Sequence, residues 1–196
     1  MIKNVILDMG NVLLDYNPPR AMELLNINPD CREIMLNEMF NSPEWEMCDR
    51  GIIDDEGMYD RVKVRVPEKY HADLKKCVDN WHICMTPLEG AVEFIKKAKE
   101  KYPLYLLSNA SNTFHTYFPK AIDPSDFEGL VVSSDIKMGK PDHEIYEYLL
   151  NKYSLEAEEC IFIDDRLPNI KAAEELGFNT FQFKGDFAPI LNMLDL

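Results

Sequence analysis

Short apolar runs that end in polar or acidic residues recur along the chain. They are VILD at 5–8, LYLLSN at 104–109, LVVSSD at 130–135 and CIFIDD at 160–165. Runs of this length, separated by helical segments, are typical of parallel strands that are covered on both faces. The pattern therefore predicts four strands of one buried sheet.

Helical patterns accompany these runs over residues 87–102, 141–155 and 167–177. The first two begin with a proline, which suits the first turn of a helix, and the third ends at Gly177, which suits a helix end. The alternation of strand and helix predicts an α/β fold, a Rossmann-like parallel sheet with helices on both faces.

The first and second apolar runs are separated by about ninety residues. A minimal crossover between parallel strands needs only ~10–12 residues. The intervening segment, from Pro19 to about Met85, is rich in Met, Leu, Glu and Lys and has helix-like stretches but little strand pattern. We expect a small α-helical insert over residues 15–85, with the α/β core formed by residues 1–14 and 86–196.

The composition narrows the range of partners. A formal net charge of −14 argues against nucleic acid and against an anionic membrane surface, and an anionic ligand would need positive charge supplied by its site. None of the five cysteines forms a Cys-x-x-Cys pair, and no apolar run approaches the roughly 20 residues of a membrane span. We expect a cytoplasmic protein, a monomer or a weak homodimer.

Polar side chains stand at the predicted strand ends: Asp8, Ser108 with Asn109, and Asp164 with Asp165. Each alone has an ordinary explanation as a turn or cap residue. In an open parallel sheet, however, ligands bind outside the carboxyl ends of the strands. The three segments together therefore predict one shared site.

Lys140 is the candidate for the missing positive charge. It lies in KMGKPDHEIY, where the pattern predicts that a helix begins at Pro141. A lysine at a helix N-terminus opposes the helix dipole, so the placement favours a nearby anion or acid cluster. The alternative is a solvated lysine in a loop, as most lysines are.

With these four segments in order, the chain resembles the haloacid dehalogenase-like (HAD) hydrolase superfamily. The likeness is greatest to bacterial sugar-phosphate phosphatases of the glucose-1-phosphate type, whose first motif reads Asp-x-Gly-Asn-Val. The matching segments are Asp8-Met9-Gly10-Asn11-Val12, Ser108-Asn109, Lys140-Pro141, and Asp164-Asp165 with Asn169. The resemblance implies a HAD-like core in which the helical insert forms a cap over the active site.

The resemblance also implies a reaction: magnesium-dependent removal of phosphate from a small phosphorylated metabolite, such as a hexose phosphate. Asp8 would be the nucleophile that forms an aspartyl-phosphate, with Lys140 and Ser108 as further catalytic residues. Asp8, the carbonyl of Gly10 and Asp165 would bind Mg²⁺. Asp164 would hold a metal-bound water, or the two neighbouring acids would exchange roles.

Phosphate contacts are implied for Gly10, Asn11, Ser108, Asn109 and Lys140, with Asn11 either orienting its loop or donating its backbone N–H.

Gly10 departs from the common family pattern, which has a second aspartate at this position to protonate the leaving oxygen. Loss of such a group typically lowers the rate by ~10²–10⁴. Activity is then low, the leaving group is a good one, as in a sugar 1-phosphate, or another residue substitutes. The first candidate is His115, with Asp15 and Asp49 as weaker ones, although an exposed helix histidine is the commoner explanation for His115.

Trp45 and Trp81 in the insert suit a platform for a sugar, but simple packing of the insert is the commoner role of such residues. Two other functions stay open. One is a metal-independent haloacid dehalogenase, and the other is a catalytically idle binding protein with a HAD fold.

Overall fold

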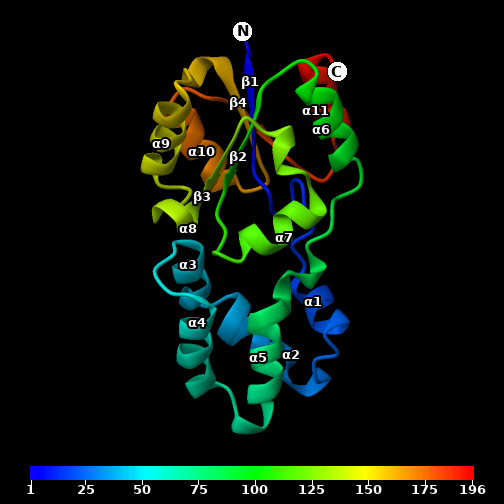
Figure 1. The fold of residues 1–196 in the computed structure, drawn as a ribbon, viewed down its shortest axis with the longest axis vertical. Coiled ribbons are helices and arrows are strands. Elements are labelled where there is room, and N and C mark those ends of the chain that lie inside the picture. Colours follow the sequence, from blue (N-terminus) through cyan, green and yellow to red (C-terminus); the bar gives the residue numbers. More distant parts are fainter.

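The computed structural model describes residues 1–196 and contains one five-stranded parallel sheet in the order β3-β2-β1-β4-β5 (Figure 1). The strands are β1 (Asn4–Leu7), β2 (Leu104–Ser108), β3 (Gly129–Val132), β4 (Cys160–Asp164) and β5 (Asn179–Gln182). β1 is central, with Leu7 aligned to Leu106 on one side and Ile163 on the other. The predicted α/β fold class is confirmed.

Helices cover both faces of the sheet (Figure 1). On one face lie α6 (Ala91–Lys99), α7 (Phe114–Ala121) and α11 (Ala188–Leu194), and on the other α9 (His143–Tyr153) and α10 (Leu167–Glu175). Val5 and Leu7 pack into the first core, whereas Ile6 packs into the second. Since β1 is buried on both faces, it holds the residue at its carboxyl end, Asp8, firmly in place.

Residues 18–84, between β1 and α6, form a helical lobe beyond the carboxyl ends of the strands (Figure 1). Its helices are α1 (Pro18–Leu24), α2 (Arg32–Met35), α3 (Pro43–Asp49), α4 (Asp55–Val62) and α5 (His71–Asn80), joined by short 3₁₀ turns and a π turn at Leu36–Phe40. Buried residues of the lobe, such as Met35 and Leu74, belong to the same hydrophobic cluster as Leu7. The predicted helical insert after the first strand is thus present.

The third apolar run differs from its prediction. β3 ends at Val132, and Ser133–Ile136 forms a short helix, α8. The hydroxyl of Ser133 accepts a hydrogen bond from the Ala110 N–H and donates one to the Asp49 carbonyl. These bonds to two other segments replace the ladder that a longer strand would have made.

Helix bounds and the number of strands also differ. α9 begins at His143 rather than Pro141, so Lys140 lies in the preceding loop and not at the helix start. α6 begins at Ala91, after Gly90 with its positive φ of 81°. β5 was not predicted, because its four residues are polar or only half-buried at the sheet edge. None of the helices combines the length and the apolar character that crossing a membrane requires.

Candidate active site

Lys140 joins two strand ends. Its Nζ donates to Oδ1 of Asp8, just after β1, and to Oδ2 of Asp164, the last residue of β4, both at 2.7 Å. All three residues are buried. The predicted convergence of Asp8, Asp164 and Lys140 is therefore present in the fold.

The charges of this group do not balance. Burial alone would lower the pKa of Lys140, but the neighbouring charges of Asp164 and Asp8 outweigh it, and the pKa lies above its usual value. Burial raises the pKa of Asp8, and Asp164 and Asp165 raise it further against the opposing effect of Lys140. One ammonium faces three acids, so the site has room for additional positive charge.

The donor set suits a divalent cation such as Mg²⁺. Asp8, Asp164 and Asp165 each offer a carboxylate oxygen, and these oxygens lie within 4.8 Å of one another. The bridge between Gly10 and Leu14 uses the carbonyl of Met9 and the N–H of Asn11, which leaves the Gly10 carbonyl without a hydrogen-bond donor. Hard oxygen ligands of this kind are the ones that Mg²⁺ prefers.

The two neighbouring acids are not equivalent. The carboxylate of Asp164 accepts bonds from Lys140, from the Arg166 N–H at 2.8 Å and from the Asn169 amide at 3.0 Å. Asp165 is half-buried, and its carboxylate has one long side-chain contact, 3.5 Å from Nδ2 of Asn11. The oxygens of Asp165 are therefore the freer of the two to bind a cation.

Ser108 and Asn109 lie at the end of β2. Ser108 is buried, its Oγ has no hydrogen-bond partner, and it does not line the cavity described below. The Asn109 amide donates to the Lys140 carbonyl and accepts the Lys140 N–H, both at 2.8 Å. The Asn109 side chain thus holds the Lys140 loop, and the phosphate contact expected at Asn109 would have to come from its backbone N–H.

Asn11 occupies the left-handed region, with φ 56°, and its N–H donates to the Leu14 carbonyl at 2.8 Å. Because this N–H already has an acceptor, the structure favours the first of the two roles expected for Asn11, orientation of its loop, over a phosphate contact. The side chain accepts the Tyr16 N–H at 3.2 Å and donates to Asp165, so Asn11 orients its own loop. The Ala110 N–H, a neighbour of Ser108, is likewise taken by Ser133.

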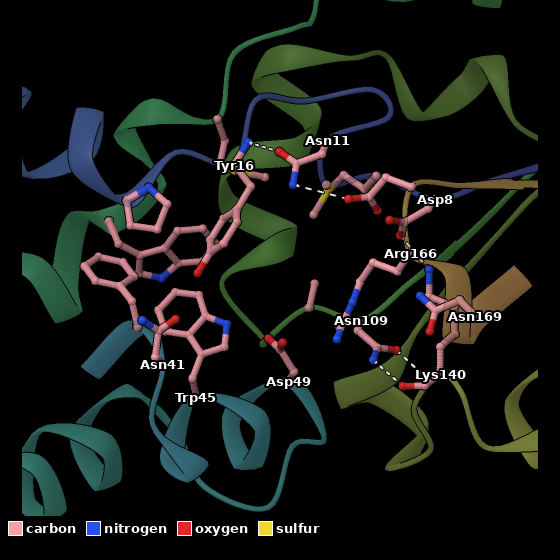
Figure 2. A pocket seen from close by; sticks show the side chains of 18 of the residues that line it. Asp8, Asn11, Tyr16, Asn41, Trp45, Asp49, Asn109, Lys140, Arg166 and Asn169 are labelled. Carbon is pink, nitrogen blue, oxygen red and sulfur yellow. Dashed lines mark hydrogen bonds and ion pairs between the residues drawn. The ribbon is translucent and has the colours of Figure 1, made fainter. Parts of the chain in front are cut away.

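A cavity of about 490 Å³ lies between the sheet and the helical lobe (Figure 2). The polar residues that line it include Asp8, Gly10, Asn11, Asn41, Asp49, Asn109, Lys140, Asp165, Arg166 and Asn169, and the aromatic ones are Tyr16, Phe40, Trp45, Trp81 and Tyr117. The ring centroids of Trp45 and Trp81 are 4.9 Å apart, and those of Tyr16 and Trp45 are 5.7 Å apart. The two tryptophans therefore both pack the insert and form a cavity wall.

Sequence reasoning missed Arg166, and it ranked Asp49 behind His115. Arg166 directly follows the acid pair, a signal that could have found it. Nε2 of His115 lies 2.9 Å from Oδ1 of Asp135, and the side chain is 56% exposed and outside the cavity. Asp15 pairs with Arg20 at 3.2 Å and does not line the cavity either.

A family model described as haloacid dehalogenase-like hydrolase matches residues 2–177. The chain belongs to this family. It is accordingly an enzyme of the hydrolase class, and the broader of the two resemblances stated above is confirmed.

Relatives of this HAD hydrolase include phosphatases. A sesquiterpene phosphatase from Aspergillus oryzae is 26% identical over 99% of this chain and 96% of its own length. A D-ribitol-5-phosphate phosphatase from Bacteroides thetaiotaomicron is 22% identical over 93% of this chain and 92% of its own length. A solved HAD family enzyme from Bacteroides thetaiotaomicron, in complex with magnesium and inorganic phosphate, has the same fold. Its TM-score is 0.78, with 24% identity over 97% of this chain and 99% of that one.

Proposed function

We propose that this HAD hydrolase is a magnesium-dependent phosphatase that acts on a small phosphorylated metabolite through an aspartyl-phosphate on Asp8. The observation that carries the proposal is the Asp8 carboxylate at the cavity, bonded to Lys140 at 2.7 Å beside two further acids. The phosphatases among its relatives support the same reaction.

Each of these residues has a separate role in the proposed reaction. Asp8 attacks phosphorus and carries the phosphoryl group until water releases it. Lys140 stabilises the negative charge that spreads over the phosphoryl oxygens. The hydroxyl of Ser108, at the end of β2, has no hydrogen-bond partner and is proposed as a further donor. Mg²⁺ would be held by Asp8, the Gly10 carbonyl and Asp165. Asp164, which is bonded to Lys140, would hold a metal-bound water. The cation would supply charge neutralisation for a carboxylate that approaches a phosphate dianion.

Residues 15–85 act in this proposal as a cap domain that closes the cavity over the core formed by residues 1–14 and 86–196. The cap contributes the Trp45 and Trp81 side of the aromatic wall. Such a wall suits a leaving group with an apolar face, and a hexose phosphate of the glucose-1-phosphate type is the first substrate to test. The sesquiterpene phosphatase relative adds phosphates of apolar alcohols to the candidates.

The five cysteines are free and buried, which supports a cytoplasmic location, and we propose a monomer or a weak homodimer.

The test is a panel of phosphorylated metabolites assayed with Mg²⁺ and with a chelator, for the wild type and for Asp8→Asn. We expect phosphate release from at least one compound that requires both Mg²⁺ and Asp8. Halide release from a haloacid that survives chelation would instead make the chain a dehalogenase. No turnover of any compound would make it an idle binding protein.

A further inference from the structure

The core side of the cavity offers no evident proton donor for a leaving group. Release of an ordinary alcohol from phosphorus requires a proton on its oxygen, and a positioned acid typically contributes ~10²–10⁴ in rate. Asp8 is the nucleophile of the proposed reaction, and Asp165, which also lines the cavity, is a proposed Mg²⁺ ligand. Lys140 and Asp164 are bonded to each other. Gly10 has no side chain, although a Cβ there would meet nothing closer than Cβ of Tyr16 at 3.9 Å. Space therefore does not explain the glycine.

Asp49, the last residue of α3, brings a carboxyl group to the same cavity from the cap. Figure 2 places it across the cavity from Asp8, on the side of Trp45. In phosphoryl transfer the attacking and leaving oxygens lie roughly in line on opposite sides of phosphorus. A group opposite Asp8 is thus on the side where the leaving oxygen departs.

Three contacts fix this part of the cap to the core. The Asp49 carbonyl accepts the hydroxyl of Ser133, and Nη1 of Arg50 lies 2.7 Å from Oδ2 of Asp142. Gly51 has φ 62°, and a Cβ on it would overlap the carbonyl of Ser134. Since α8 and the Lys140 loop both belong to the core, Asp49 is held at a defined position relative to Asp8.

The surroundings of Asp49 favour its protonated form. Its pKa is raised to about 7, mainly by burial and further by Glu46 and Asp8, against the opposing effect of Arg166. The charged and titratable groups that face it are Glu46 on its own helix, Asp8 after β1, Arg166 after β4, Tyr16 in the connection to α1 and Tyr117 on α7. A proton donor and acceptor works best when its pKa lies near the working pH.

We propose that Asp49 is the general acid and base of this enzyme, a catalytic residue supplied by the cap in place of an acid at position 10. The proposal rests on the phosphatase function proposed above. In the first step an Asp8 oxygen bonds to phosphorus, the ester P–O bond breaks, and the Asp49 proton passes to the leaving oxygen. In the second step Asp49 takes a proton from water and the water oxygen bonds to phosphorus. The bond between phosphorus and the Asp8 oxygen breaks, which restores the Asp8 carboxylate and frees inorganic phosphate.

The test compares Asp49→Asn with the wild type on two esters of similar shape, benzyl phosphate and p-nitrophenyl phosphate, in Mg²⁺. The p-nitrophenolate oxygen can leave phosphorus without being protonated. The oxygen of benzyl alcohol must receive a proton as it leaves. We expect kcat/KM for benzyl phosphate to fall by ~10²–10⁴. The first-turnover burst of nitrophenolate should fall less than about tenfold, followed by slow steady-state turnover because the base is missing.

A matched pair on α3 provides the second measurement. Glu46 raises the pKa of Asp49, whereas Glu44 bonds to Arg65 and is not among the groups that act on Asp49. The protonated acid is lost as pH rises, so Glu46→Gln should move the alkaline limb of the benzyl phosphate profile to lower pH. Glu44→Gln should leave that limb in place.

Two outcomes separate the proposals. If wild-type enzyme hydrolyses neither ester nor any metabolite of the panel, the phosphatase function and the role of Asp49 both fall. If the wild type is active but Asp49→Asn slows the first turnover of both esters equally, or of neither, the role of Asp49 alone is overturned. As a control for misfolding, the thermal unfolding midpoint of Asp49→Asn is compared with that of the wild type.

Discussion

Replacement of Lys140 by Met removes the ammonium but keeps most of the volume of the side chain. Nζ of Lys140 bonds to Asp8 and Asp164 at 2.7 Å each, and the side chain is 1% exposed. The variant therefore leaves two buried carboxylates without their counter-ion. Loss of one partner of a buried ion pair costs about 3–5 kcal/mol of unfolding free energy.

The structure places the cost toward the lower end of that range. Asp164 keeps the Arg166 N–H and the Asn169 amide as donors, and Asp8 borders the cavity, where water solvates it in part. We expect a loss of about 3 kcal/mol at pH 8 without Mg²⁺. With a urea m-value of about 2–3 kcal/mol/M, the midpoint of unfolding should fall by roughly 1 M.

Urea unfolding followed by circular dichroism measures this loss, and a double-mutant cycle with Asp164→Asn tests its cause. Once Asp164 is neutral, removal of Lys140 strands one charge instead of two, so the two changes should couple by about 1–3 kcal/mol. A midpoint for Lys140→Met close to that of the wild type, or strictly additive effects, would refute the counter-ion role of Lys140.

Three further outcomes follow from the same contacts. Asp165→Asn should weaken Mg²⁺ binding, measured by calorimetry, by at least about tenfold, because a carboxylate ligand becomes neutral. The control variant Glu144→Gln, at an exposed residue, should leave Mg²⁺ binding unchanged. Equal affinities of Asp165→Asn and the wild type would count against Asp165 as a ligand. Burial raises the pKa of Asp49 to about 7, so folding disfavours its ionised form and the penalty grows as pH rises from about 4 through 7. Asp49→Asn should thus raise urea stability relative to wild type at pH 8 but not at pH 4, and a gain of the same size at both would contradict the shift. Tyr146→Phe removes the hydroxyl that donates to the buried Asn169 carbonyl at 2.9 Å and should cost about 1–2 kcal/mol in thermal unfolding; no measurable cost would mean that the carbonyl finds another donor.

The sheet and its strand ends could be predicted because local pattern determines them. Buried parallel strands read as continuous apolar runs, and the topology of an open sheet brings their carboxyl ends together. β5 lacked this signal, since NTFQ is an edge strand with polar residues. The strand predicted through Asp135 failed because the hydroxyl of Ser133 bonds to the Ala110 N–H and the Asp49 carbonyl, partners that no local pattern reveals.

The role of Asp49 on the cap side of the site could not be predicted for a related reason. Asp49 and His115 are both polar residues on helices, and spacing alone does not say which faces the cavity. The docking of Arg50 on Asp142 and of Gly51 on Ser134 turns Asp49 inward, whereas His115 pairs with Asp135 outside. The contacts that dock the cap on the core join residues more than eighty positions apart in the sequence.

The charges around the cavity couple the binding of Mg²⁺ to the binding of phosphate. The acids that the cation and the substrate would meet are Asp8, Asp49, Asp164 and Asp165, against two cations, Lys140 and Arg166. A phosphate dianion that enters such a cavity in an acidic protein meets net repulsion unless a divalent cation is bound or Asp49 holds a proton. Each of these changes adds positive charge near the phosphate, so Mg²⁺ and phosphate must strengthen one another's binding by the same factor. The proton on Asp49 acts in the same direction, so the state of the cap acid that favours phosphate binding is also the state that can protonate the leaving group.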